Sequence, residues 1–136
     1  MIVALCLTLF MGEGLLNNTM YSVDDCLFCN IIKRTIPADI IYETDEIIAF
    51  NDINPEAPHH LLIIPKNHIA TINNLDAKNS FIMGSMFEAA VYLAKKFGVT
   101  ESGYRVVMNC NADAGQTVFH IHLHFLAGRN LTWPPG

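Results

Sequence analysis

The stretch FHIHLHFLAG, residues 119–128, alternates imidazole rings with large apolar side chains. Histidines stand at positions 120, 122 and 124, and Ile121, Leu123 and Phe125 lie between and after them. Residues two apart in a β-strand share a face, because successive side chains point to opposite sides of the sheet. The spacing therefore predicts a strand over 119–126, with three imidazoles on one face and three core side chains on the other.

Three explanations are open for a row of imidazoles on one strand face. The row can be a solvated surface, it can bind a metal, or it can act on a substrate phosphate, with one ring as the nucleophile and the others as donors. The turn AGQT, residues 114–117, precedes the strand and combines a glycine with two side-chain donors. Its position favours a phosphate site over a solvated surface.

The composition indicates a single globular domain without a nucleic-acid surface. The chain has 136 residues, of which 51% are hydrophobic and 15% are charged, and its net charge is −5. This length suits one domain with a substantial core. The absence of any lysine or arginine run argues against binding to a nucleic-acid backbone, but a nucleotide ligand needs only local donors.

The first residues, MIVALCLTLFMG, are apolar but do not resemble a complete targeting segment. The run is too short to span a bilayer as a helix, no basic residue precedes it, and no small-x-small cleavage site follows it. We interpret residues 1–20 as an N-terminal extension, either a stretch read from an upstream start codon, with Met20 as the natural start, or a disordered segment, in preference to a secretory signal, and we expect no membrane partner. Residues 21–136 then form the domain.

The four cysteines, at positions 6, 26, 29 and 110, show no disulfide pattern and indicate a reducing compartment. Cys26 and Cys29 have the C-x-x-C spacing that brings two thiolates to one metal, although redox-active or simply buried thiols share that spacing. His68 and His120 are candidates to complete a four-ligand structural zinc site. The first histidine of the row then faces the metal and the other two face a substrate.

The remaining pattern predicts an α+β domain of five strands and two helices, with short connections that suit antiparallel pairing. Asp24 or Asp25 is expected to cap the first helix, and Gly98 to end the second. The expected helices span 27–34 and 77–97, and the expected strands span 40–45, 46–52, 60–65, 104–109 and 119–126.

Several motifs together resemble the histidine triad (HIT) superfamily, and most closely its Hint branch of purine nucleoside phosphoramidases. They are CLFCNIIKRTIPADIIYETD, AFNDINPEAPHHLLIIPKNHI, GYRVVMN, AGQTVFHIHLHFLAGR and the terminal WPPG, and they cover about residues 25–136. The resemblance implies a HIT-like five-stranded antiparallel sheet with two helices, and a homodimer in which two sheets join. The C-x-x-C pair is typical of bacterial relatives and suggests a cytoplasmic protein.

The resemblance also implies a purine nucleotide site. Asp52 is expected to hold the ribose hydroxyls, and His60 is the upstream histidine associated with the triad. Two positions depart from the Hint pattern. Asn51 stands where Hint proteins often have a histidine, and Thr117 stands where they have a serine. The expected base pocket comprises Leu27, Phe28, Ile31, Ile36, Phe50 and Ile53, and the expected phosphate site comprises Asn109, Gly115, Gln116, Thr117, His122 and His124.

The expected reaction is hydrolysis of the P–N bond in a nucleoside 5′-phosphoramidate, with His122 as the nucleophile and no catalytic cofactor. His120, His124, His60 and Thr117 complete the expected catalytic set. The C-terminal LTWPPG is expected to place Trp133 against the partner's active site. Three alternatives are a dinucleoside polyphosphate hydrolase, a nucleotide-binding or partner-binding module with little turnover, and a zinc-dependent hydrolase that uses all three triad histidines as ligands.

Overall fold

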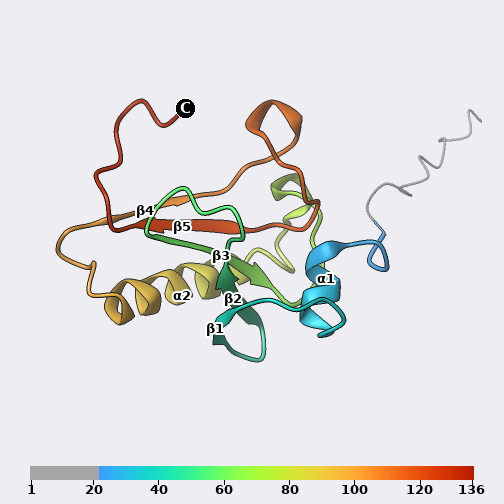
Figure 1. Ribbon diagram of the computed structural model, residues 1–136. Coiled ribbons are helices and arrows are strands. Elements are labelled where there is room, and N and C mark those ends of the chain that lie inside the picture. The colour runs from blue at the N-terminus through green and yellow to red at the C-terminus, as the bar shows by residue number, and fades with distance from the viewer. Residues whose placement is uncertain (1–21) are drawn as a thin grey trace, which may run out of the picture.

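The computed structural model describes residues 22–136, so the extension proposed for residues 1–20 lies outside the described residues. The predicted fold class is confirmed: one antiparallel sheet, in the order β1-β2-β3-β5-β4, is combined with two α-helices (Figure 1). Within this part of the chain, no helix is both long and apolar enough to cross a membrane. The elements are α1 (Leu27–Ile32), β1 (Ile40–Glu43), β2 (Ile47–Asn51), β3 (His59–Pro65), α2 (Ile82–Lys96), β4 (Tyr104–Val107) and β5 (Leu123–Ala127), with short 3-10 turns at Ile72–Asn74 and Ala112–Ala114.

The sheet has an apolar cluster on each face, and each helix belongs to one of them. In β2, Ile47 and Ala49 pack in the cluster that contains α2, whereas Ile48 and Phe50 pack in the cluster that contains α1. This division follows from the two-residue period of a strand, and it explains why β2 and β3 are almost continuously apolar. The α1 face carries the candidate site.

The long helix α2 begins five residues later than predicted. The Oδ1 atom of Asp76 accepts hydrogen bonds from the backbone N–H groups of Lys78 and Asn79, at 2.7 and 3.2 Å, and this local turn replaces the first helical turn. The predicted C-terminal end is confirmed. Gly98 adopts a φ of +67°, and the Val99 N–H donates to Ala94 O, as in a Schellman motif.

The short helix α1 is capped differently from the prediction. Cys26, rather than Asp24 or Asp25, is its N-cap, and the Cys26 sulfur accepts a hydrogen bond from the Cys29 N–H at 3.4 Å. The helix ends at Ile32, before the predicted position 34, because Arg34 has a left-handed backbone with φ of +63°. The first turn of α1 therefore depends on a sulfur contact.

The strand predicted over 119–126 begins only at Leu123. The N–H of Ile121 donates to Ile69 O at 2.7 Å instead of joining the sheet ladder, so residues 119–122 run beside the 68–72 segment. The predicted alternation nevertheless holds, because Ile121, Leu123 and Phe125 all lie in the α2-side core. Likewise, β4 ends at Val107, two residues before its predicted end.

Antiparallel register brings one row of side chains across the α1 face of three strands. Phe50 in β2 pairs with Leu62 in β3, and Leu62 pairs with His124 in β5. Residues directly opposite one another in paired strands share a face. The row therefore leads from an apolar surface beside α1 to an imidazole, and these three residues line the cleft described below.

Candidate active site

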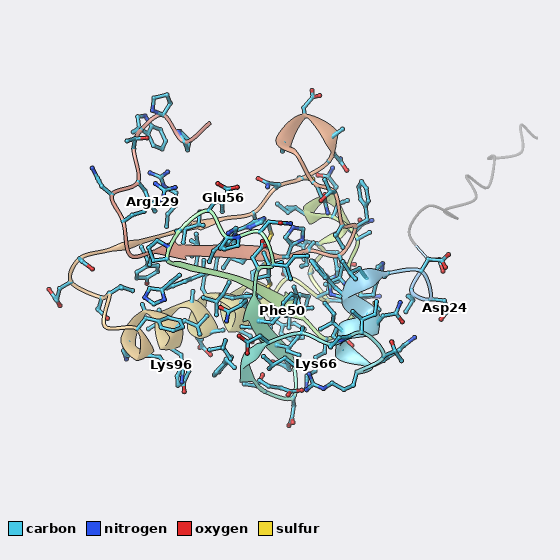
Figure 2. All side chains as sticks on the ribbon, viewed as in Figure 1. Asp24, Phe50, Glu56, Lys66, Lys96 and Arg129 are labelled. Carbon is cyan, nitrogen blue, oxygen red and sulfur yellow. The ribbon has the colours of Figure 1, made fainter. Side chains whose placement is uncertain are left out.

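A cleft of about 490 Å³ opens between α1, the segment that precedes β1, the end of β2 and the triad segment. Its walls are more apolar than polar, and three of its polar residues, Asp52, His122 and His124, lie close to one another. Such a combination of an apolar pocket and a few convergent polar groups is typical of small-molecule sites. Phe50, which lies centrally in the molecule, forms part of the apolar wall (Figure 2).

The orientation of His122 is fixed by the backbone of its own segment. Its Nδ1 atom lies 2.7 Å from the carbonyl oxygen of His120. A carbonyl oxygen only accepts, so Nδ1 carries the proton and Nε2 keeps its lone pair in the neutral ring. The ring lines the cleft, and its unprotonated nitrogen can therefore act as a nucleophile.

A chain of hydrogen bonds fixes the opposite tautomer in His124. The N–H of Glu56 donates to His60 Nδ1 at 3.0 Å, so the neutral His60 ring carries its proton on Nε2. That Nε2–H donates to His124 Nδ1 at 2.9 Å and also lies 3.4 Å from Asp52 Oδ2. His124 is therefore left with a proton on Nε2, and it offers a donor where His122 offers a lone pair.

Asp52 is held by the same loop that supports His60. Its Oδ1 atom accepts the N–H of Asn54 at 2.9 Å, which fixes a turn directly after β2. Arg129 braces this loop by donating from Nε to Glu56 O at 2.9 Å, and the two residues lie close together in Figure 2. The loop thus delivers both a carboxylate and the Glu56 N–H to the site.

Burial keeps the two cleft imidazoles neutral near pH 7. It lowers the pKa of His124 to about 4, with the neighbouring imidazoles His122 and His60 acting in the same direction and the Asp52 carboxylate opposing them. Burial also lowers the pKa of His122, against the opposing effects of its hydrogen bond to His120 O and the Asp52 charge. Both rings are therefore neutral, with a lone pair on Nε2 of His122 and a proton on Nε2 of His124. Their centroids lie 5.1 Å apart.

The 110–118 loop contributes less through side chains than its sequence indicates. Both Nε2 protons of Gln116 are used, by Ala70 O at 2.8 Å and Val118 O at 3.1 Å, and its Oε1 accepts the N–H of Asn111. The buried Gln116 carboxamide thus holds the loop in shape. Thr117 and Val118 of this loop line the cleft, and Thr117 is the polar one of the two.

A separate cluster of two thiols and two imidazoles lies behind the cleft. The ligand atoms of Cys26, Cys29, His68 and His120 all lie within 4.8 Å of one another. His120 Nδ1 is 3.5 and 3.6 Å from the sulfurs of Cys26 and Cys29, and His68 Nδ1 is 3.3 Å from the Cys29 sulfur. In tetrahedral zinc sites, bond lengths of about 2.3 and 2.0–2.1 Å separate sulfur and nitrogen ligands by roughly 3.5 Å. The observed spacing therefore fits zinc.

The hydrogen bonds of the cluster also suit a cation. His120 Nε2 lies 2.7 Å from Pro65 O, so Nε2 is protonated and the Nδ1 lone pair faces the sulfurs. Burial and the adjacent Cys26 raise the pKa of Cys29 to about 12 without a metal, so thiolates here require a positive charge. A second group, formed by Asp52, His60 and His124, does not fit, because the His60 proton occupies its centre.

The amino-acid sequence is similar to those of known proteins. A family model described as scavenger mRNA decapping enzyme C-term binding matches residues 25–131. A HIT-like protein of Synechococcus elongatus is 46% identical over 113 residues, which cover 83% of this chain and 98% of the relative. The purine nucleoside phosphoramidase of Escherichia coli K12 is 45% identical over 108 residues, which cover 79% of this chain and 91% of the relative.

Solved structures give the same result. The crystal structure of a HIT family hydrolase from Legionella pneumophila has a TM-score of 0.81 and 52% sequence identity, and the match covers 82% of this chain and all of that chain. A HIT family hydrolase from Clostridium thermocellum has a TM-score of 0.79 and 46% identity, and the match covers 82% and 96% of the two chains.

This chain belongs to the HIT family. The resemblance inferred from its motifs is thereby confirmed, and the protein is an enzyme of the hydrolase type that its relatives represent. The three histidines of this HIT protein do not form a common metal site within residues 22–136. His120 belongs to the Cys/His cluster, while His122 and His124 line the cleft.

Most residues expected at the substrate site of the HIT domain line the cleft. Asn109, Gly115, Gln116 and Trp133 do not, and the Asn51 side chain donates to Asp39 Oδ2 at 2.6 Å. The expected residues that line it are Leu27, Phe28, Ile31, Ile36, Phe50, Asn51, Asp52, Ile53, Thr117, His122 and His124. Sequence reasoning missed Pro37, Ala38, Asp39, Asn54, Leu62 and Val118.

The C-terminal segment of this HIT protein extends away from the sheet (Figure 1). Arg105 Nη2 donates to the carbonyl oxygens of Leu131 and Thr132, at 3.2 and 2.9 Å, and so anchors the start of the tail to β4. Trp133 is 82% exposed and does not cover the core of its own domain.

Proposed function

We propose that this HIT hydrolase cleaves the P–N bond of purine nucleoside 5′-phosphoramidates, such as adenosine 5′-monophosphoramidate. The main support is the hydrogen bond from His122 Nδ1–H to His120 O, which leaves a lone pair on Nε2 of a ring that lines the cleft. The apolar wall around Phe28 and Phe50 suits a flat base, and Asp52 suits ribose hydroxyls. A relative that is 45% identical is a purine nucleoside phosphoramidase, which supports this substrate class.

The proposed chemistry has two balanced steps. His122 Nε2 attacks the α-phosphorus, the P–N bond breaks, and the amine leaves with a proton supplied through Thr117 or a neighbouring imidazole. Water then attacks the nucleotidyl-histidine, which releases the nucleoside monophosphate and restores the His122 lone pair. His124, whose Nδ1 accepts from His60, would donate from Nε2–H to a phosphoryl oxygen as negative charge develops.

We also propose that Cys26, Cys29, His68 and His120 hold one structural zinc ion per protomer. A closed set of four protein ligands would supply a cross-link rather than a reactive water. The reaction above uses only the side chains of the cleft, so the ion takes no part in its steps.

The three cysteines among residues 22–136 are free thiols, which supports a location in the reducing cytoplasm.

A homodimer with a joined sheet is the proposed assembly. β4 lies at one edge of the sheet, and edge strands offer unpaired backbone groups to another chain. Apolar side chains of α2 are also exposed, including Phe87 and Val91, and Tyr104 of β4 is exposed as well. Sedimentation equilibrium should therefore give twice the mass of one chain, and a monomer at micromolar concentration would contradict the proposal.

The exposed tail supports a role beyond its own subunit. A large exposed aromatic ring usually marks a contact surface. We propose that Trp133 reaches the partner's cleft and shapes the side where the amine leaves. Truncation after Asn130 should leave a folded dimer with an altered ranking of small and bulky phosphoramidates. An unchanged ranking would make the tail structural only.

Rapid-quench mass spectrometry tests the central proposal. Wild-type protein mixed with adenosine 5′-monophosphoramidate should acquire one adenylyl group on His122, whereas His122→Ala should lose turnover and still bind adenosine monophosphate. Faster cleavage of dinucleoside polyphosphates than of phosphoramidates would favour the alternative hydrolase. Nucleotide binding without an adduct or turnover would favour a binding module.

A further inference from the structure

The Cys/His cluster and the nucleotide cleft are built from the same two segments. Cys26 and Cys29 bracket the first turn of α1, and the two residues between them, Leu27 and Phe28, line the cleft. On the other side, the His120 ring faces the sulfurs while its carbonyl oxygen holds His122 Nδ1 at 2.7 Å. A displacement of either segment therefore changes both sites.

Phe28 is the side chain that touches both sites at once. It is only 3% exposed, and its ring makes edge contacts with His122 and His120, at centroid distances of 5.2 and 5.9 Å. It also meets Phe50 in the apolar wall at 5.6 Å. The position of the Phe28 ring therefore affects the width of the cleft, and the ring packs against one side of His122.

The first turn of α1 depends on its tertiary contacts, which include buried side chains packed in the cluster on its face of the sheet. The helix has six residues, fewer than an isolated helix needs to be stable in water. Its N-cap is the Cys26 sulfur, which is also a member of the cluster. An ion shared by Cys26, Cys29 and His120 would tie this turn to the triad segment across more than 90 positions of sequence separation.

We propose that His120 and Phe28 are positioning residues that couple metal occupancy of the cluster to nucleotide binding and to the orientation of His122. The proposal rests on the metal site and the nucleotide site proposed above. Coupling between two sites is reciprocal, so the metal must raise nucleotide affinity by the factor by which the nucleotide raises metal affinity. Couplings of this kind are about 5- to 150-fold.

The first experiment measures that factor in the whole protein. Metal content is determined first, and adenosine monophosphate is then titrated calorimetrically into zinc-loaded and metal-free protein. Zinc affinity is measured in a chelator competition with and without the nucleotide. We expect tighter nucleotide binding by at least about fivefold in the loaded form and an equal factor for zinc.

The outcomes separate the underlying proposals from this one. Absence of bound zinc would overturn the metal site and the coupling with it, and absence of nucleotide binding to either form would overturn the proposed function. Normal binding of both ligands with equal nucleotide affinity in the two forms would overturn the coupling alone.

A pair of variants tests the route through Phe28. Phe28→Leu keeps all four metal ligands and an apolar cleft but removes the ring edges, so the coupling factor should fall toward one. Ile36→Val is the matched control, because Ile36 lines the cleft and is not a member of the cluster. It should change nucleotide affinity equally in the loaded and metal-free forms. A full coupling factor in Phe28→Leu would exclude this route.

If the metal-free protein does not fold, the coupling is tested in protein that carries cobalt(II) in place of zinc. The visible absorption of cobalt in the cluster reports its ligand geometry without any catalytic turnover. Adenosine monophosphate should change this spectrum in the wild type and leave it nearly unchanged in Phe28→Leu. A wild-type cobalt spectrum that does not respond to saturating nucleotide would overturn the coupling.

Discussion

His60 joins a backbone N–H to the triad, and its two ring nitrogens can be tested separately. Asparagine places a side-chain oxygen near the position of His Nδ1, and glutamine places an amide nitrogen near the position of His Nε2. His60→Asn should therefore keep the acceptor for the Glu56 N–H and lose the donor to His124. His60→Gln should keep the donor to His124 and lose the acceptor for Glu56.

The expected magnitudes follow from burial. His60 is 6% exposed and His124 is partly buried, so removing the donor leaves His124 Nδ1 unsatisfied at a cost of about 1–3 kcal/mol. At about 1.4 kcal/mol per decade, kcat/KM of His60→Asn should fall roughly 5- to 150-fold, because the His124 ring is no longer held in its donating tautomer. His60→Gln should retain most activity. Its loss of the Glu56 bond should cost about 0.5–1.5 kcal/mol of stability, since Glu56 lies at the surface.

Two assays on the same preparations decide the matter. Phosphoramidate turnover gives kcat/KM, and urea unfolding gives the free energy of unfolding with its m-value. Glutamine should exceed asparagine in activity by about a factor of five or more. Both substitutions remove ring packing, so the comparison between them cancels much of that shared loss. Equal activity in the two variants, or higher activity in His60→Asn, would refute the tautomer argument.

Three other outcomes are expected. The His124 proton signals should titrate near pH 4 by NMR, and at a lower pH still in Asp52→Asn, because the Asp52 charge raises this pKa. Because the pKa of His124 is depressed in the folded protein, the stability associated with it is present above about pH 6.5 and is lost as the pH falls toward 4. Gly128→Ala should cost more unfolding free energy than Gly103→Ala, by about 1–3 kcal/mol, because both have positive φ but only the new Cβ at 128 meets Pro58 Cβ, at 2.9 Å. Metal removal should lower the melting temperature in calorimetry, since a closed zinc site contributes to folding.

Local periodicity was sufficient to predict much of the fold. The alternation of Ile121, Leu123 and Phe125 correctly identified one core face, and Gly98 correctly marked the end of α2. Both features depend only on the geometry of a single element. The start of β5 was wrong because Ile121 donates to Ile69, a partner that no local pattern reveals.

Site residues were predictable in proportion to how local their partners are. The pair Cys26 and Cys29 follows from one helical turn, whereas the commitment of Gln116 to Ala70 O depends on a contact 46 positions away. Sequence alone gives Gln116 a donor for a ligand, and the fold uses that donor to hold a loop. Leu62 was missed because it reads as plain core until strand register places it between Phe50 and His124.

The triad shows why residue type alone does not assign a role. His120, His122 and His124 are identical side chains, but three different partners fix their protons: Pro65 O, His120 O and the His60 Nε2–H. The first ring therefore presents Nδ1 to the sulfurs, the second keeps a lone pair on Nε2, and the third keeps a proton on Nε2. Because each partner lies on fixed backbone or on a ring held by backbone, the protons are set before any ligand binds. In the proposed reaction, a substrate phosphate that enters this cleft would meet a nucleophile on His122 and a donor on His124 that are already distinguished, and no proton would have to move before attack.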